Sequence, residues 1–379
     1  MISSVTLKND PLLFPALKNN PNAGEELKLL ENSLTGSTIN SIGRHGKYFW
    51  LRLNLADSKE TGVLLMHFGM TGMIKIKNIH SNLVIMENGG DKKVRNEIEK
   101  EKAAIKLEIK DEVEAGKEDN PNDSSDKNDN DSLWPPRFAK FEMKLKKDSQ
   151  EYDLAFVDPR RLGRVRFLTG PEVQTDQKLL NTKPLSELGP DYSKPATVVS
   201  LDEFKSGDPD PNNHGRPRLN LKDFNKLILS KKKPIKSLLL DQAFFAGVGN
   251  WVGDEICYHA RINPNEVISN KLDKDSDEID PVIKQLYDSL IYVCEESVRL
   301  EGISKNFPDN WLMLYRWGKG RKAPKARTIE GYTVDHETIG GRTSCFVPQL
   351  QKPLKRRQKE DATSSIQHPS QRKKPKVES

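Results

Sequence analysis

The segment at residues 246–255, AGVGNWVGDE, restricts the fold most strongly, because it places three glycines around one Asn and one Trp. A dinucleotide-binding turn needs the spacing G-x-G-x-x-G directly after a strand, so that the pyrophosphate meets the start of a helix. Here the spacing is one residue longer, and the apolar residues Ile235, Leu238, Leu239 and Phe245 before it recur at helical spacing. The segment is therefore expected to join two helices, where exposed backbone N–H groups can still attract an anion.

The net charge of +6 is unevenly distributed. Residues 87–131 hold nine basic and fifteen acidic side chains, residues 352–379 hold nine basic and three acidic ones, and the remainder is also basic. A basic globular part with a basic tail indicates a polyanionic partner. In the tail, KRRQK and QRKKPK flank a polar spacer, which is typical either of a solvated charge run or of a two-part nuclear import signal.

The remaining bulk features exclude several classes of protein. No run of about 18 apolar residues is present, so no membrane span is expected. The first ten residues have neither a signal-peptide core nor an Arg-rich amphipathic face. The three cysteines, Cys257, Cys294 and Cys345, form no C-x-x-C pair, which favours reduced intracellular thiols over a disulfide framework.

The periodicity of apolar residues changes along the chain, and this predicts an α+β fold. Residues 38–86 and 137–168 are rich in aromatic and β-branched residues and are expected to form strands. From LGPDYSKPATVVSLDEF onward the pattern becomes helical, and after Gly302 it becomes short and irregular, ending in a small hairpin. The segment KEDNPNDSSDKNDND has almost nothing to bury and is expected to be disordered.

Five blocks occur in one order: GRHGKYFWLRL, LLMHFGMTG, VDPRRLGRV, IKSLLLDQAFFAGVGNWVGDEICYHARINP and GGRTSCFVPQLQK. They span residues 43–352 and together resemble the formamidopyrimidine-DNA glycosylase family, especially its fungal and plant branch. The resemblance implies an N-terminal β-sandwich domain, a helix-two-turn-helix domain and a C-terminal β-hairpin finger around DNA. The expected boundaries are a β-sandwich domain at 1–86 and 132–170, a disordered acidic insertion at 87–131, an interdomain linker at 171–199, a helix-two-turn-helix domain at 200–305, a zincless finger at 306–351 and a disordered basic tail at 352–379.

The resemblance assigns two sets of DNA-binding residues. An enzyme that acts on one base must rotate its nucleotide out of the duplex and fill the hole. The filling residues map onto Met70, Arg160 and Leu162, with Leu162 at a position where many relatives carry Phe. Alone, Met70 is more simply explained as core, whereas the pair Arg160 and Arg161 requires carboxylate or phosphate partners. The residues that grip the flanking phosphates map onto Lys47, His67, Lys236, Asn250 and Arg342; without the resemblance, a strand Lys or a lone His is usually structural.

No metal or other cofactor is expected. Many relatives close the finger with four cysteines around zinc, a site that needs two Cys pairs. Here Val347 and Leu350 stand where the second pair is expected, no first pair exists, and Cys345 cannot form a site alone. The segment GGRTSCFVPQL is therefore similar to the zincless finger of the same family, in which packing replaces the metal.

In the family that the chain resembles, the nucleophile is the amine of an N-terminal Pro, which forms a Schiff base with the sugar. The Glu that follows it transfers protons. The sequence begins Met1-Ile2 and continues with SSVTLKND, so the catalytic Pro-Glu segment is not in it. Lys47 is left as an accessory catalytic candidate. Either the start codon lies further upstream, or this is a shortened isoform or relative.

Three functions are consistent with these residues. The first is a base excision repair enzyme of the nucleus, a DNA glycosylase and abasic-site lyase that flips oxidised purines (8-oxoguanine and formamidopyrimidines) out of duplex DNA. The second is a catalytically inactive protein that binds damaged DNA. The third is an RNA-binding protein with a helix-two-turn-helix element, although the HFGMTG and DPRRLG segments would have no role there. The expected partners are damaged double-stranded DNA and a nuclear import receptor that binds the tail, and the protein is expected to be a monomer.

Overall fold

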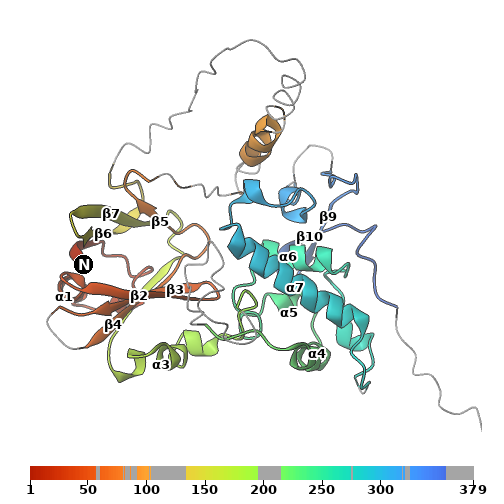
Figure 1. Cartoon of the computed structure of the whole chain (residues 1–379), viewed down its shortest axis with the longest axis horizontal. Helices are drawn as coiled ribbons and strands as arrows, with labels where there is room; N and C mark the ends of the chain where they lie inside the picture. Colours follow the sequence, from red (N-terminus) through yellow and green to blue (C-terminus); the bar gives the residue numbers. More distant parts are fainter. Residues whose placement is uncertain are drawn as a thin grey trace, which may run out of the picture.

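The computed structural model describes residues 1–56, 60–79, 81, 86, 92–101, 103, 134–194, 215–274, 276–317, 319–320 and 325–355. A β-rich part and a helical part lie side by side, as the periodicity predicts (Figure 1). No helix within the described ranges is long and apolar enough to cross a membrane.

The β-rich part is a sandwich of two antiparallel four-stranded sheets, with the strand orders β1-β6-β7-β5 and β2-β3-β4-β8. Its core lies between the sheets and joins Phe141 and Phe156 of one sheet to Leu64 and Met66 of the other. This confirms the predicted sandwich. The strands are β1 (Ile2–Leu7), β2 (Thr38–His45), β3 (Tyr48–Asn54), β4 (Thr61–His67), β5 (Met73–Ile76), β6 (Ala139–Lys147), β7 (Gln150–Val157) and β8 (Arg164–Leu168).

Two helical segments that the sequence analysis does not assign cover the sandwich. Helix α1 (Ala23–Leu34) buries Leu27 and Leu34 in the core between the sheets. Residues 171–194 were expected to be an interdomain linker, but they contain α3 (Asp176–Leu180) and pack on the outer face of the β2-β3-β4-β8 sheet. This packing is driven by burial of apolar side chains, because the buried leucines and Val173 of the segment cover Trp50 and its neighbours on that face.

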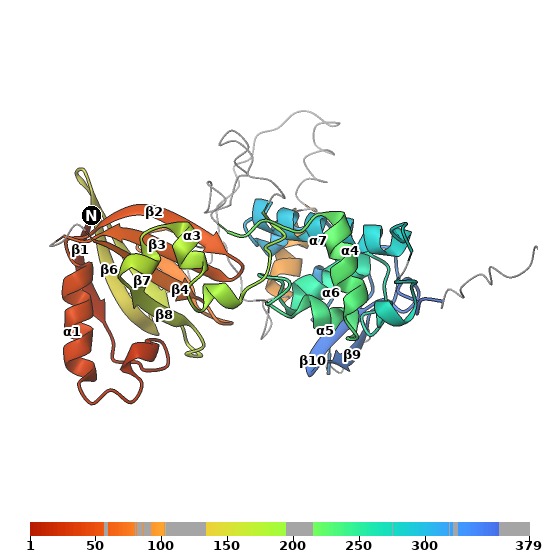
Figure 2. The same cartoon turned by 90° about the horizontal axis from the view of Figure 1, so that it is seen from below.

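The helical part contains α4 (Leu221–Ser230), α5 (Ile235–Leu239), α6 (Asn250–His259) and α7 (Pro281–Arg299). Helix α6 packs on both α5 and α7 around a large apolar core. The β9–β10 hairpin (Asp335–Ile339 and Arg342–Phe346) projects beside α5 (Figure 2). Its turn, at Gly340 and Gly341, has positive φ at both positions, which is the geometry that a two-residue hairpin turn favours.

Part of the acidic insertion is ordered, in contrast to the expected disorder at 87–131. Residues 92–101 form a helix whose Val94 is 1% exposed and packs in the core of the helical part. Glu101 at its end forms an ion pair with Lys305 at 3.5 Å. The apolar positions Val94 and Ile98 lie one helical turn apart on one face, which explains the docking. Most of the insertion, and the tail beyond residue 355, lie outside the described residues.

The two parts meet where the β2–β3 turn touches the loop between α5 and α6. A Cβ on Gly46 would lie 2.9 Å from the backbone nitrogen of Gly247, so only glycine permits this approach. Buried Asp191 accepts hydrogen bonds from the Gly46 N–H at 2.8 Å and from Arg44 at 2.9 Å. Buried His45 bonds through Nε2 to the Gly189 carbonyl at 3.0 Å.

The titration of His45 gives a prediction about stability. Its Nδ1 accepts the Arg216 N–H, and burial lowers its pKa to about 4, as burial also does for His67. Because the folded pKa lies below the ordinary value of 6.5, the unfolded chain binds more protons between those pH values. We expect the urea concentration at the unfolding midpoint to fall as the pH drops from 6.5 to 4. In His45→Gln this midpoint should change less steeply with pH. An equal dependence of the midpoint on pH in both proteins would contradict the prediction.

Candidate nucleic-acid interface

Lys47 lies at the meeting point of the two parts. Its Nζ donates to the Val248 carbonyl at 3.1 Å, and its Cε lies 3.9 Å from the position of a Cβ on Gly249, which caps α6. Burial lowers the pKa of Lys47, and repulsion from Arg342 lowers it further. Since Arg342 is the first residue of β10, the sandwich, α6 and the hairpin bring positive groups together here.

His67, at the end of β4, faces the same cluster. It lies opposite Tyr48 and Arg164 on the neighbouring strands, and its Nδ1 accepts the Gly69 N–H at 2.9 Å, which leaves the proton on Nε2. Its pKa is about 4 because of burial first and then the positive charges of Lys47, Arg164 and Arg166. We call Lys47, His67, Arg164, Arg166 and Arg342 the cationic site.

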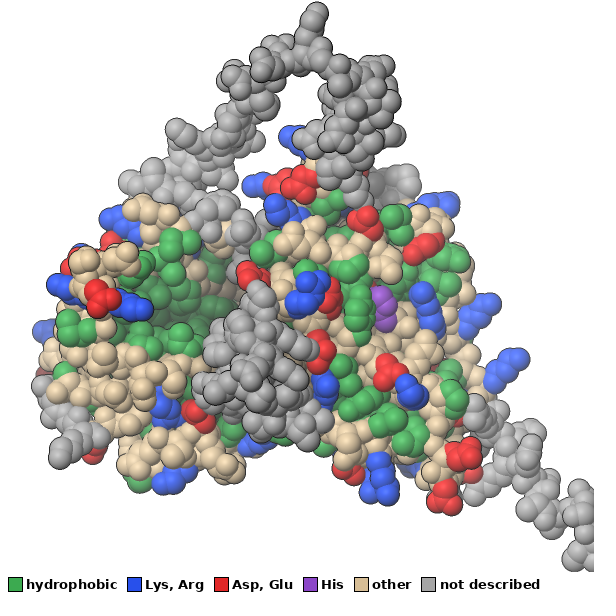
Figure 3. Space-filling model, in the orientation of Figure 1, with side chains coloured by type: hydrophobic (Ala, Val, Ile, Leu, Met, Phe, Trp, Pro, Cys, Tyr) green, Lys and Arg blue, Asp and Glu red, His purple; other side chains and the backbone are tan. Residues whose placement is uncertain are grey.

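Carboxylates are missing from the cationic site within the part of the chain that the structure describes. There, none pairs with Lys47, Arg164, Arg166 or Arg342, and every charge that shifts the pKa of His67 is positive. Like charges gathered without partners repel one another, so their proximity favours an anionic ligand. Elsewhere the charges are mixed: on the face drawn in Figure 3, acidic and basic side chains are interspersed over the helical part. Lys47, His67 and Arg342 were predicted from the sequence, whereas Arg164 and Arg166 were not; their signal is the alternation in RVRFL.

Two apolar side chains project from neighbouring loops of the sandwich. Met70 is 52% exposed and Leu162 is 39% exposed, which excludes the alternative that Met70 is a core residue. Their loops are in backbone contact, since a Cβ on Gly69 would lie 2.5 Å from the Leu162 carbonyl carbon. With a φ of +64°, Gly69 also has a conformation that favours glycine. The structure therefore brings together two of the three residues predicted to fill the DNA stack.

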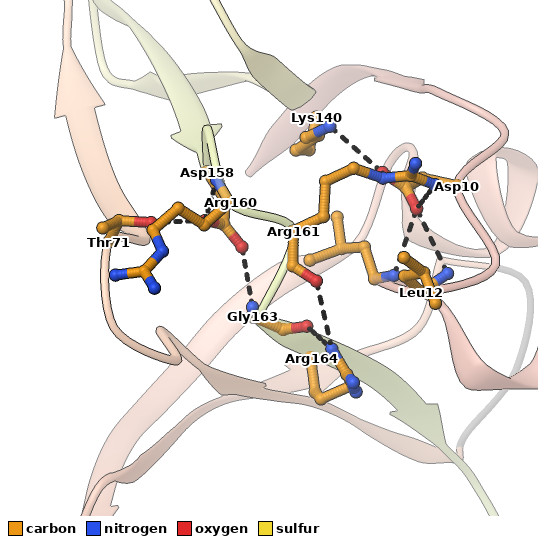
Figure 4. Close-up of polar contacts among 10 residues, drawn as sticks. Asp10, Leu12, Thr71, Lys140, Asp158, Arg160, Arg161, Gly163 and Arg164 are labelled. Atoms are coloured by element: carbon orange, nitrogen blue, oxygen red, sulfur yellow. Dashed lines mark hydrogen bonds and ion pairs between the residues drawn. The ribbon is translucent and has the colours of Figure 1, made fainter.

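Asp158 organises both loops from inside, a role that the sequence analysis missed. It is fully buried, and its Oδ1 accepts hydrogen bonds from Thr71 Oγ1 at 2.9 Å and from the Arg160 N–H at 3.2 Å (Figure 4). Its Oδ2 accepts the Gly163 N–H at 2.7 Å. One carboxylate thus fixes the loop of Arg160 and Leu162 against the loop of Met70.

The two adjacent arginines have different surroundings. Arg161 donates from Nε and Nη2 to the carboxylate of Asp10 at 2.9 and 2.8 Å, and Lys140 also binds Asp10 (Figure 4). These cations hold the pKa of Asp10 well below its usual range against the effect of burial. Arg160 is exposed, as the predicted contact with DNA requires. The expected carboxylate partner is therefore found for Arg161.

Asn250 is the first residue of α6 and connects it to the hairpin. Its Nδ2 donates to the Thr343 carbonyl at 3.0 Å, while its buried Oδ1 has no hydrogen-bond partner among the described residues. The Gly249 cap leaves the first N–H groups of α6 without a side-chain acceptor. Their position beside Lys47 places the positive end of the α6 dipole at the cationic site.

Lys236 is a correction to the predicted set of phosphate ligands. Its side chain is fully buried, and its Nζ donates to Asp254 and to the backbone carbonyl of Asn250. The second oxygen of Asp254 accepts Arg316 Nη2 at 2.8 Å. Lys236 is therefore a positioning residue beneath Asn250 and cannot reach a phosphate from this position.

Glu255, next to Asp254 in the GDE sequence, holds the chain that leads into the hairpin. Its two oxygens accept the backbone N–H groups of Leu312 at 3.0 Å and Met313 at 2.7 Å. The hairpin itself packs through buried Cys345 and Val347 against Tyr258 and its neighbours. Within the described ranges, no group of three or more His, Cys, Asp or Glu side chains is arranged to hold a metal ion.

The role of Asp158 gives a prediction. Because Asp158→Ala removes three hydrogen bonds to a buried carboxylate, we expect a loss of about 2–4 kcal/mol in the free energy of unfolding. Protease cleavage within residues 158–163 should also become faster. Asp153→Ala is the matched control, since Asp153 makes only solvent-exposed ion pairs with Lys77 and Lys144 and should cost at most about 1 kcal/mol. Equal losses of unfolding free energy in the two variants would refute the role of Asp158 in fixing the two loops.

Comparison with known proteins agrees with this geometry. Residues 2–165 match the model of the formamidopyrimidine-DNA glycosylase N-terminal domain, and residues 208–309 match the model of the H2TH domain of the same enzymes. The formamidopyrimidine-DNA glycosylase of Arabidopsis thaliana is 30% identical over 323 residues, which are 85% of this chain and 60% of that protein. The enzyme of Listeria innocua is 26% identical over 204 residues, 53% of this chain and 62% of that protein.

Solved structures show the same fold. A complex between the Lactococcus lactis protein Fpg and DNA with an abasic site aligns with a TM-score of 0.52 at 19% identity, and covers 93% of this chain and 92% of that one. A structure of MutM with DNA containing carbocyclic 8-oxo-G aligns with the same score and coverage at 18% identity. This chain spans about 60% of the length of these two curated relatives. Because both domain models belong to one family and together cover the sandwich and the helical part, the chain belongs to the formamidopyrimidine-DNA glycosylase family.

Proposed function

We propose that the protein is a base excision repair enzyme, a DNA glycosylase and abasic-site lyase that removes oxidised purines (formamidopyrimidines and 8-oxoguanine) from duplex DNA. The observation that carries this proposal is the cationic site beside exposed Met70 and Leu162. Phosphate-binding groups without carboxylate partners, next to apolar side chains held in solvent, are what flipping a nucleotide requires.

The proposed order of events follows from the surroundings of each residue. Backbone phosphates bind to Lys47, Arg342 and the N–H groups at the start of α6, which relieves the repulsion within the cationic site. His67 donates from Nε2, because its Nδ1 is occupied by the Gly69 N–H. Met70 and Leu162 then enter the duplex where the damaged nucleotide leaves the stack, with Arg160 beside them.

Excision needs a nucleophilic amine and a carboxylate for proton transfer, which the resemblance assigns to an N-terminal Pro and Glu. The Met1 amine donates to the Lys146 carbonyl at 2.9 Å, at the end of the sandwich away from the helical part (Figure 1). Both curated relatives are formamidopyrimidine-DNA glycosylases, which favours an enzyme over an inactive binding protein. For Lys47 we propose an accessory role through the phosphate next to the reacting sugar. Its pKa is lowered first by burial and then by repulsion from Arg342.

Two features of the assembly are part of the proposal. We propose a monomer, since one chain supplies both sides of the cationic site. We also propose that the finger is zincless, because buried Val347 and half-buried Leu350 take part in an apolar cluster at the positions of the second ligand pair.

We also propose that the protein acts in the nucleus and that its basic tail, most of which lies outside the described residues, binds an import receptor. The basis is the pair of clusters KRRQK and QRKKPK. A fluorescent protein fused to residues 352–379 should accumulate in the nucleus, and replacement of the basic residues in both clusters by Ala should abolish this. Uniform distribution of the unmodified fusion would contradict the proposal.

DNA binding tests the central part of the proposal. The chain should bind a duplex with a stable abasic-site analogue more tightly than the same undamaged duplex. Asn250→Ala and Arg342→Ala should each weaken that binding by about 1–3 kcal/mol, the typical cost of losing a charged or buried hydrogen bond. Asn265→Ala is the control, because its exposed side chain bonds only to Glu337 in the finger. Equal affinity for both duplexes would refute damage recognition, and unchanged affinity of both variants would refute the assigned site.

A further inference from the structure

Strand β8 carries two arginines on one face, Arg164 and Arg166. Val165 between them points into the sandwich core, so the arginines lie on the opposite face of the sheet. In the antiparallel pairing of β8 with β4, Arg164 lies opposite His67 and Arg166 lies opposite Leu65. Both arginines are half-buried, and both act electrostatically on His67. They therefore adjoin the proposed phosphate ligands.

A third arginine on this face shows that the sheet can neutralise such a charge. Arg52 on β3 is buried and donates to the Asp176 carboxylate and to the Val173 carbonyl, both in the segment that covers the face. The Arg166 side chain has no hydrogen bond or ion pair among the described residues. Leaving a half-buried guanidinium without a partner is unfavourable unless a ligand completes the site.

Arg164 has a second connection, to the loop that carries Leu162. Its Nη1 donates to the Gly163 carbonyl at 2.6 Å and also lies 3.5 Å from the Arg161 carbonyl (Figure 4). These bonds use only one of its nitrogens, and Nε and Nη2 have no acceptor among the described residues. A guanidinium has five N–H donors, so Arg164 can hold the loop and bind an oxyanion simultaneously.

We propose that Arg164 and Arg166 form a further phosphodiester-binding site on β8, which takes a backbone phosphate of the DNA next to the one held by Lys47 and His67. This rests on the proposed function. The guanidinium fork matches two phosphate oxygens, which a lysine cannot do. Since Arg164 also bonds to the loop of Leu162, the site couples the grip on the backbone to the position of the side chain that enters the duplex.

The test measures the affinity of purified variants for the abasic-site duplex at several salt concentrations. Arg166→Gln should bind about tenfold more weakly, equally for damaged and undamaged duplexes, because a phosphate contact carries no information about the base. The slope of log affinity against log salt should become shallower by about 0.9, the value for one lost phosphate contact. Arg164→Gln should in addition reduce the preference for the damaged duplex, because its loop loses a restraint.

Two controls separate a phosphate contact from general effects. Arg299→Gln changes the net charge equally but removes an arginine that pairs with Glu296 on α7, and it should keep the parent slope. Arg166→Lys should retain the slope with weaker affinity. A parent chain that does not prefer damaged DNA would refute the proposed function. A parent that does, together with an Arg166→Gln variant of unchanged slope and affinity, would overturn only the inference about β8.

Discussion

The contact between Gly46 and Gly247 determines how the two parts of the chain meet. Gly46 lies in the turn that carries Lys47, and Gly247 lies in the loop that ends at the start of α6. A Cβ on Gly46 would lie 2.9 Å from the Gly247 nitrogen, and a Cβ on Gly247 would lie 3.2 Å from the Gly46 Cα. A side chain on either glycine would therefore push the two backbones apart and move Lys47 away from the positive end of α6. Asp191 reinforces the contact by accepting the Gly46 N–H. Neither the sandwich nor the helical part contains the whole cationic site, so this approach of two backbones is required for it to form.

Four acidic residues around the interface are buried, whereas the basic residues of the cationic site are partly or fully exposed. Asp158, Asp191, Asp254 and Glu255 all lie in the interior and accept hydrogen bonds from backbone N–H groups, Arg or Lys. A carboxylate placed this way fixes a loop by several bonds without presenting its charge to solvent. In Asp158 this arrangement positions the loops of Met70 and Leu162, and in Glu255 it positions the chain leading to the hairpin. The surface offered to phosphates thereby stays positive.

Much of this architecture could be predicted from the sequence. The switch from strand-rich to helical periodicity predicts the α+β class, and the motif blocks indicate Lys47, His67, Asn250 and Arg342, which lie near one junction in the structure. Single-residue environments could not be predicted in the same way. Lys236 occupies a family position for a phosphate ligand, but burial decides its role, and burial depends on Asp254, eighteen residues away in sequence. The partner of Arg161 is Asp10, 151 residues away in sequence.

Segments that look like connections were predicted least well. Residues 171–194 have weak periodicity, yet their leucines cover an outer sheet face that only the tertiary structure exposes. The helix at 92–101 is mostly charged, and its two apolar positions are too few to predict docking without knowledge of the surface that receives them. The arginines of β8 were overlooked because alternation with apolar residues is typical of any half-exposed strand. Within the part of the chain that the structure describes, the lack of a partner for the Arg166 side chain distinguishes it.

The most direct test is an experimental structure of the chain bound to a duplex with an abasic-site analogue. The account predicts a backbone phosphate within hydrogen-bonding distance of Lys47 Nζ, the Arg342 guanidinium and the first N–H groups of α6. It also predicts that the side chains of Met70 and Leu162 lie inside the duplex at the missing base. A complex in which the DNA avoids the junction of the two parts and both apolar side chains stay in solvent would contradict it.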